Sequence, residues 1–80
     1  MTDEVREMIV PGNKIRCWIG SKTDHPSSEI WHIRAIVDEK QIVFRWWRPG
    51  RGWRYMVESW TFFEAYHSVG LLSLCGREKI

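Results

Sequence analysis

Residues 41–58 read QIVFRWWRPGRGWRYMVE, and this stretch decides the fold of the chain. Strand-favouring residues lie on both sides of a short segment that holds Pro49, Gly50 and Gly52. Proline fixes one backbone φ angle and glycine accepts positive φ, so this segment suits a tight reversal. We therefore predict two antiparallel strands, 41–47 and 53–59, joined by an arginine- and glycine-rich loop.

Two segments on the amino-terminal side extend this hairpin. Residues 14–19 alternate between an apolar face and a polar face, which is typical of a half-buried strand. Residues 30–37 are apolar on both faces, and a polar turn at 38–40 leads into the hairpin. The intervening residues 20–29 (GSKTDHPSSE) predict a surface loop of about ten residues. Strands two to four are expected to form an antiparallel meander.

Helices are predicted at two places. Thr2, followed by acidic residues, can cap a short helix that runs through Met8, although an extended segment is the alternative. The sequence Thr61-Phe62-Phe63-Glu64 fits a capping box and predicts a helix over about 62–69, with Gly70 as its carboxy-terminal cap.

After this helix, residues 71–75 are predicted to form a last strand. The order of strand, long loop, three-strand meander, short helix and strand resembles that of SH3-like and Tudor-like barrels. The resemblance is one of element order only, and it implies a small five-stranded antiparallel barrel, with a strongly bent sheet as the alternative. Eighty residues form one domain, with an amino-terminal segment at 1–10, a core at 14–75 and a polar tail at 76–80. The small size also resembles that of proteins from phages and mobile gene cassettes.

The aromatic content indicates where a working surface lies. Six Trp, three Phe and two Tyr residues ask for on the order of 2,000 Å² of interior, since each ring buries about 150–250 Å². A chain of 80 residues encloses little volume, so some ring surface is expected to remain exposed at a binding face or an oligomer interface. Because neighbours on a strand point to opposite faces, only one of Trp46 and Trp47 can face the core.

Charge points to the same hairpin. Net charge is +2 overall, but residues 30–60 carry six basic and three acidic side chains, and no acidic residue lies between Arg45 and Tyr55. Guanidinium groups contact phosphates and aromatic rings stack on unpaired bases, so nucleic-acid binding is the leading hypothesis. Four phosphate contacts on duplex DNA predict a log–log salt slope of about −3.6. The candidate binding residues are Arg45, Trp47, Arg48, Arg51, Trp53, Arg54 and Tyr55.

Other uses of this surface remain open. Arginine stems can simply lie on tryptophans that belong to the core, with no ligand involved. The rings can also grip a proline-rich or other peptide, hold a cation in an aromatic cage, or bind a small molecule. The main rival is a homodimer or a contact with another protein that covers the surplus tryptophans.

Several classes of function lack support in the sequence. No local signature of a nucleophile with a base is present, and the histidines and cysteines lack metal-ligand spacing, so we expect a non-enzymatic module without metal or cofactor. No apolar run reaches membrane-spanning length, and the charged start MTDEVRE argues against a secretory signal, so the expected location is cytoplasmic. Cys17 and Cys75 are interpreted as small core residues, with a disulfide between the first and last strands as the alternative.

Overall fold

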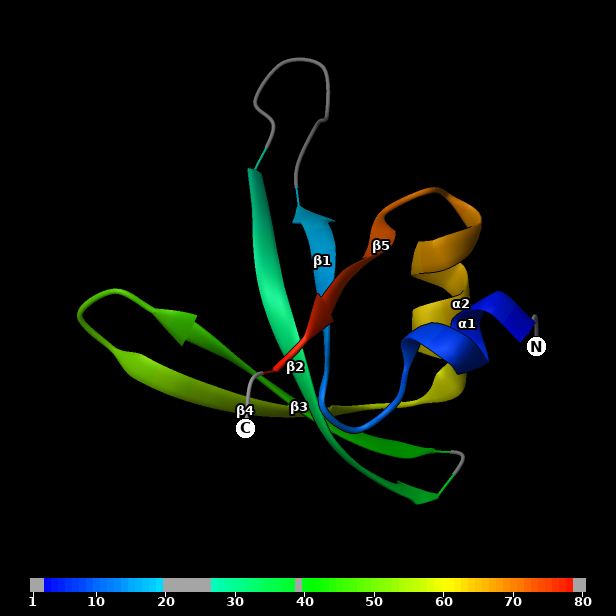
Figure 1. The fold of residues 1–80 in the computed structure, drawn as a ribbon, viewed down its shortest axis with the longest axis horizontal. Coiled ribbons are helices and arrows are strands. Elements are labelled where there is room, and N and C mark those ends of the chain that lie inside the picture. The colour runs from blue at the N-terminus through cyan, green and yellow to red at the C-terminus, as the bar shows by residue number, and fades with distance from the viewer. Residues whose placement is uncertain (1–2, 20–26, 39, 79–80) are drawn as a thin grey trace.

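A computed structural model describes residues 3–19, 27–38 and 40–78, and it shows one five-stranded antiparallel sheet with two short helices (Figure 1). The elements are α1 (Asp3–Met8), β1 (Asn13–Ile19), β2 (Ser27–Asp38), β3 (Gln41–Arg48), β4 (Gly52–Glu58), α2 (Trp60–Ser68) and β5 (Leu72–Arg77). The strand order β4-β3-β2-β1-β5 leaves β4 and β5 as separate edges. The mostly β fold and the meander are confirmed, whereas an SH3-like barrel is not, because the sheet is open.

The long strand β2 explains the shape of the sheet. Its first half pairs with β1 and its second half pairs with β3, so His32 lies opposite Lys14 on one side and Arg45 on the other. Register shifts near Arg34 and Val37 add bends to the second half. Beyond Arg45, the recorded partners of β3 are on β4 alone, and this end of the β3–β4 hairpin projects from the molecule (Figure 1).

The boundaries of β2 correct the predicted 20–29 loop. Residues 27–29 belong to β2, where they pair with β1 residues 17–19. The ladder therefore extends three residues further than the turn-forming composition of this segment indicated. The remainder of that loop, 20–26, lies outside the described residues.

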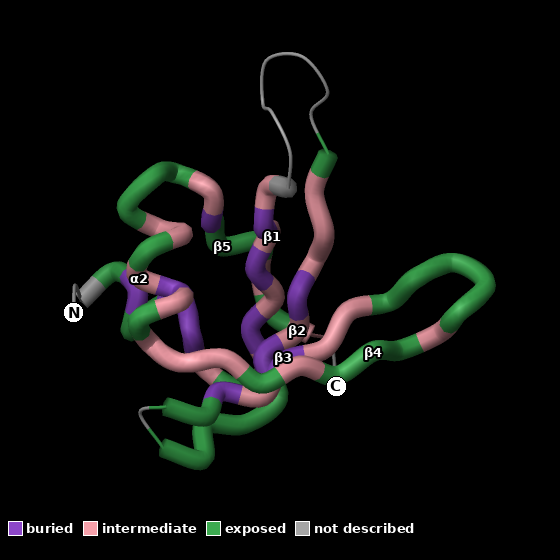
Figure 2. The backbone as a smooth tube through the Cα atoms, turned by 180° about the vertical axis from the view of Figure 1, so that it is seen from behind, coloured by how far each residue is buried: buried purple, intermediate pink, exposed green. Residues whose placement is uncertain are grey.

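The hydrophobic core lies between the helices and one face of the sheet. Trp31 is at its centre, with its ring centroid 4.6 Å from that of Phe44 and 6.2 Å from that of Phe63 on α2. The buried apolar residues are Val5, Met8, Ile9, Ile15, Cys17, Trp31, Ile33, Ile42, Phe44, Phe63 and Leu72. Figure 2 shows buried stretches in the central strands of the sheet and in α2. Because the helices fill the inner side of the bent sheet, the sheet curls over them and does not close on itself.

The start of α2 differs from the predicted capping box. The helix begins at Trp60, and the N-cap is Ser59, whose hydroxyl accepts a hydrogen bond from the Phe62 backbone N–H at 3.4 Å. Thr61 is therefore inside the helix, and the predicted capping box was wrong. The earlier start places Trp60 and Phe63 three positions apart on one helix side, where both pack against the core.

The end of α2 agrees with the prediction. Gly70 has a positive φ of 76°, and its N–H donates to the carbonyl of His67 at 3.0 Å. The Leu71 N–H donates to the carbonyl of Tyr66 at 2.9 Å, so the two bonds form a Schellman motif. The chain then reverses into β5.

Asn13 ties both ends of the chain together. Its buried side-chain amide donates to the carbonyl of Met8 at 3.0 Å, and its oxygen accepts from Arg77 Nη1 at 2.8 Å. The Glu78 N–H donates to the Gly12 carbonyl at 2.7 Å. The chain is therefore bound to the fold as far as Glu78, which corrects the predicted tail at 76–80 for residues 76–78. Residues 79–80 lie outside the described part.

The two cysteines occupy different environments. Strands β1 and β5 do pair, as the disulfide alternative required, but both thiols are free. Cys17 is completely buried, whereas Cys75 is exposed at a register shift in β5, so the expectation of a core position was wrong for Cys75. Burial, assisted by the nearby carboxylate of Glu29, raises the pKa of Cys17 to about 11.

This raised pKa predicts a loss of stability at alkaline pH. Below pH 9 the Cys17 thiol is protonated in both states; between about pH 9 and 11 only the unfolded chain ionises, so folding weakens as pH rises. In a Cys75→Ser background we expect about 1 kcal/mol less stability at pH 10 than at pH 8 from this group. Urea unfolding at both pH values gives the pH dependence of stability for this protein and for the Cys17→Ala, Cys75→Ser protein. The contribution of the Cys17 thiol is the difference between the two. An identical pH dependence of the two proteins would contradict the assignment.

Candidate functional site

The candidate site lies on the sheet face that the helices leave uncovered. Ile42 and Phe44 of β3 are buried in the core, so Arg45 and Trp47 point to the opposite face. Register places Arg45 opposite Tyr55 and Trp47 opposite Trp53 on the edge strand β4. Four of the predicted site residues are thus brought together as two adjacent cross-strand pairs. We call this surface the outer face.

Arg45 is held against the aromatic rings of β4. Its guanidinium carbon is 3.9 Å from the centre of the Trp53 ring, and its Nη1 donates to the Tyr55 hydroxyl at 3.0 Å. Its Nε is buried and has no hydrogen-bond partner among the described residues. These contacts fix a cation on one side of Trp53, which combines a charged group and a flat ring in one place.

The rings of the outer face remain accessible. Trp47 is 57%, Trp53 40% and Tyr55 61% exposed, which confirms the expectation that the chain cannot bury all of its aromatic surface. The Trp47 and Trp53 rings meet edge to face with centroids 5.6 Å apart. Trp46, by contrast, packs against the core, so the prediction that one of the two adjacent tryptophans faces outward is also confirmed.

Strands β1 and β2 add side chains to this face that were not predicted as site residues. His32 stands edge-on to Trp53, with ring centroids 5.1 Å apart, and Lys14 is its partner across β1. Arg16 follows on the same face and lies 5.8 Å from the centre of the Trp18 ring. The alternation of residues 14–19 placed Lys14, Arg16 and Trp18 on one face. No local sequence pattern, however, predicts the strand pairing that brings this face next to Arg45.

Two hollows flank the tryptophan pair. One, of about 380 Å³, is lined by Lys14, His32, Arg45, Trp53 and Glu78. The other, of about 410 Å³, is lined by Ser28, Glu29, Ile30, His32, Trp47, Arg48 and Pro49. His32 belongs to both, and each has one indole in its wall. Volumes of this order match the space that a small ligand or a nucleotide unit occupies.

A carboxylate lies inside the first hollow. Glu78 Oε1 is 2.6 Å from His32 Nδ1, and Glu78 Oε2 accepts a hydrogen bond from Arg34 Nη1 at 3.0 Å. A carboxylate oxygen accepts in such a contact when the imidazole tautomer carries its proton on Nδ1. An anionic group is thus already held in a basic setting on the outer face.

The other three predicted arginines are less closely grouped. Arg54 alternates to the opposite side of β4, where its guanidinium carbon is 5.9 Å from the centre of the Trp46 ring. Arg51 lies in the turn, and its N–H donates to the carbonyl of Arg48 at 3.0 Å. Arg48 is exposed at the end of β3 and lines the second hollow. The hairpin therefore presents its arginines in several directions.

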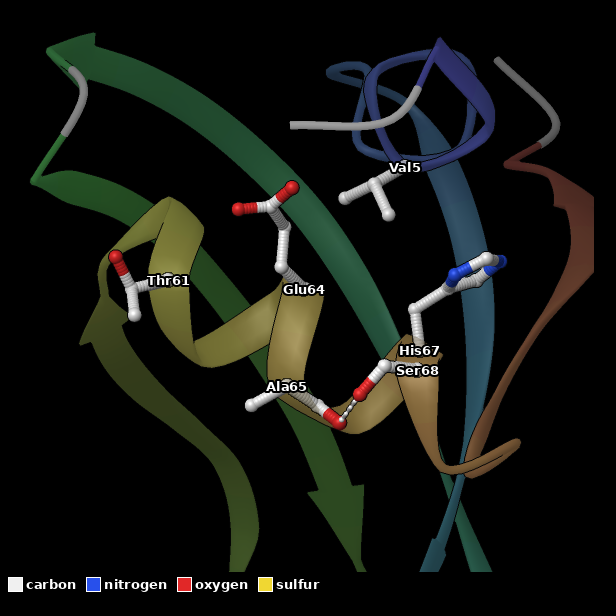
Figure 3. A pocket seen from close by; sticks show the side chains of 6 residues that line it. All are labelled: Val5, Thr61, Glu64, Ala65, His67 and Ser68. Carbon is white, nitrogen blue, oxygen red and sulfur yellow. Dashed lines mark hydrogen bonds between the residues drawn. The ribbon is translucent and has the colours of Figure 1, made fainter.

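A third hollow lies beside the helices (Figure 3). It measures about 460 Å³ and is lined by Val5, Thr61, Glu64, Ala65, His67 and Ser68. Ser68 donates its hydroxyl to the Ala65 carbonyl at 2.8 Å, and His67 Nε2 contacts Glu4 Oε2 at 3.2 Å. The serine and the histidine are therefore engaged elsewhere, and no nucleophile–base contact is recorded between them.

Residues 3–19, 27–38 and 40–78 hold neither a metal-ligand cluster nor a membrane-spanning helix. Within these ranges, no group of three or more His, Cys, Asp or Glu side chains is placed to hold a metal ion. No helix in the same ranges combines the length and the apolar character that a membrane crossing requires.

No protein-family model matches the chain, and neither a curated protein nor a solved structure matches it.

Proposed function

We propose that this protein is a non-enzymatic module that binds single-stranded nucleic acid on the outer face of its sheet. The observation that supports the proposal most directly is the packing of the Arg45 guanidinium over the Trp53 ring, with the exposed rings of Trp47 and Tyr55 beside it. A strand of nucleic acid needs both elements, because its phosphates seek cations and its bases seek flat apolar rings.

The charge on this face favours a polyanion. Lys14, Arg16 and Arg45 come from the two strands that flank β2; Lys14 and Arg45 lie in register across His32, and Arg16 lies opposite Ile30, two residues before His32. Positively charged groups on one face attract and orient a negatively charged phosphate backbone. Three phosphate contacts on a single strand would give a log–log salt slope of about −2.

Exposed rings favour an unpaired strand over a duplex. Base–aromatic stacking requires bases whose faces are open, and in a duplex those faces are covered by neighbouring bases. The two hollows beside the tryptophan pair give each indole an open side. We therefore expect oligo(dT) or oligo(U) to bind more tightly than a duplex of equal length.

The experiment compares two arginines on opposite faces of the same hairpin. Arg45→Gln removes a charge from the outer face, and Arg54→Gln removes the same charge from the other face, where Arg54 lies near Trp46. We expect Arg45→Gln to weaken binding of a labelled oligo(dT) and to make the salt slope shallower by about 0.7. Fluorescence anisotropy measures both quantities. Equal effects of the two variants, or no binding by the original protein in 50 mM salt, would refute the proposal.

A homodimer through the edge strand β4 is the second candidate. Its outward side chains Trp53, Tyr55 and Val57 are 40%, 61% and 54% exposed, and exposed apolar edges invite pairing with another chain. Val57→Lys separates the two functions, because it places a charge in the edge without removing a stacking ring. If the dimer is the function, the original protein has twice the mass of one chain in solution, and the Val57→Lys variant has the mass of one chain. If nucleic-acid binding is the function, Val57→Lys retains oligonucleotide affinity.

A further inference from the structure

We propose that His32 and Arg34, with Lys14 and Arg45 nearby, form a binding site for one phosphate group, and that the Glu78 carboxylate occupies this site in the unliganded protein. The inference deepens the proposed function and rests on it for the identity of the natural ligand, a phosphodiester. Lys14, His32, Arg45 and Glu78 line the hollow of about 380 Å³ that also contains Trp53, and Arg34 joins the site through its contact with Glu78.

The contacts of Glu78 are those that a phosphate would make. Two oxygens of one planar group reach two donors on neighbouring positions of β2, His32 Nδ1 at 2.6 Å and Arg34 Nη1 at 3.0 Å. A phosphate presents the same acceptor oxygens with at least equal negative charge, and arginine forks suit both groups. The donors are therefore already arranged for an oxyanion.

The surroundings favour an anion with a ring attached to it. Lys14 and Arg45 line the same hollow and add positive charge, and the Trp53 ring forms part of its wall. A nucleotide has a phosphate within a few bonds of its base, so the phosphate can bind at His32 while the base lies on an indole. The site therefore suits a nucleotide unit better than an isolated carboxylate.

Glu78 can leave this position without unfolding the sheet. Its backbone N–H is fixed to the Gly12 carbonyl at 2.7 Å, and the preceding Arg77 is bound to Asn13 at 2.8 Å. The carboxylate is therefore presented by an anchored backbone, and only rotation of the side chain is needed to release it. Its side chain is 21% exposed, so solvent reaches it from one side.

The consequence is competition between Glu78 and the ligand. A bound phosphate must displace the carboxylate and would be repelled by it if it stayed nearby, so affinity is lower than the cations alone would give. Glu78→Gln keeps the shape of the side chain and removes the charge. Glu78→Asp keeps the charge on a side chain that is shorter by one methylene group, so its carboxylate is withdrawn from the two donors.

The matched control is Glu4→Gln. Glu4 also contacts a histidine, with 3.2 Å between its Oε2 and His67 Nε2, but it lies on α1, an element of the helical layer that covers the other face of the sheet. Glu4→Gln therefore changes net charge and breaks a histidine contact in the same way, without touching the outer face. Any general effect of charge on anion binding appears in both proteins.

Inorganic phosphate and oligo(dT) are the two probes, measured by titration of the His32 NMR signals and by anisotropy. We expect Glu78→Gln to bind both probes about three- to tenfold more tightly than the original protein, Glu78→Asp to show a smaller gain, and Glu4→Gln to show none. Unchanged affinity in both Glu78 variants, or an equal gain in Glu4→Gln, would overturn the inference. If the protein binds oligo(dT) but the Glu78 variants bind it with unchanged affinity, this phosphate site is refuted and the proposed function is not. If Glu78→Gln binds phosphate more tightly but the protein does not bind oligo(dT), the proposed function is refuted and this site is not.

Discussion

Trp31→Ala is expected to destabilise the folded protein strongly, with a much lower urea midpoint of unfolding. Trp31 is 5% exposed and lies between the sheet and α2, with ring centroids 4.6 Å from Phe44, 5.9 Å from Phe62 and 6.3 Å from Tyr66. Truncating a buried tryptophan costs about 3–5 kcal/mol, because the transfer free energy is lost and a cavity remains. A chain of 80 residues has only about 4–12 kcal/mol of total stability, so this is a large fraction.

Two other substitutions make the result interpretable. Trp47→Ala removes the same atoms from a ring that is 57% exposed, and we expect it to cost less than about 1 kcal/mol. Trp31→Phe keeps an aromatic ring and removes an indole N–H that has no partner among the described residues, so its cost is expected to be about 1–2 kcal/mol. Urea unfolding followed by circular dichroism ranks the three. If Trp31→Ala were no less stable than Trp47→Ala, the core described above would be incorrect.

The comparison of sequence and structure shows which features are local. The β3–β4 hairpin followed from Pro49, Gly50 and Gly52, and the end of α2 followed from Gly70, because positive φ angles belong to glycine. The start of α2 did not follow, since Ser59 and Thr61 both have capping side chains; the structure has Ser59 as the N-cap, which places Trp60 inside the helix and against the core. A local pattern can offer two caps, and tertiary packing selects one.

The sequence did not predict whether the sheet is open or closed, for a different reason. Strand order and strand number are the same in an open and a closed sheet, and the difference lies in whether β4 and β5 meet. Here α1 contributes Val5 and Met8 to the core, Ile9 follows directly after it, and α2 contributes Phe63. A six-residue helix with a weak local signal thus fills the space that a barrel would need.

The candidate site was predictable only where one hairpin supplies it. Trp47, Trp53 and Tyr55 lie near one another in sequence, and alternation with β3 pairing places them together. Lys14, His32 and Glu78 come from three distant segments, and their meeting depends on the double pairing of β2 and the anchored backbone at Gly12. No local pattern marks such a cluster, so it emerged only from the folded arrangement.

Trp53→Leu is expected to cause the largest loss of oligonucleotide affinity among single substitutions of the outer face. Trp53 carries Arg45 at 3.9 Å on its ring, meets Trp47 at 5.6 Å and meets His32 at 5.1 Å, so its removal takes away a stacking surface and loosens three neighbours. One base–aromatic stack contributes about 1–3 kcal/mol, which corresponds to roughly 5- to 150-fold in the dissociation constant.

The control for this substitution is Trp60→Leu. Trp60 also has an arginine beside its ring, with the Arg6 guanidinium carbon 5.9 Å from the centroid, but it begins α2 and packs against the core. We expect Trp60→Leu to lower stability while leaving the affinity of the folded protein within about twofold of the original. Because a labelled oligonucleotide reports anisotropy without using tryptophan emission, the loss of a fluorophore does not bias either value.

The pattern of the two variants distinguishes recognition from packing. If Trp53 only shields Arg45, then Trp53→Leu keeps oligonucleotide affinity, since leucine still covers the arginine stem. If Trp53 stacks on a base, affinity falls and the salt slope changes little, because the charges of Lys14 and Arg16 remain in place. A loss that is accompanied by a proportionally shallower slope would instead mean that the ring acts through Arg45. The affinity and the slope, measured together, therefore assign the role of the ring.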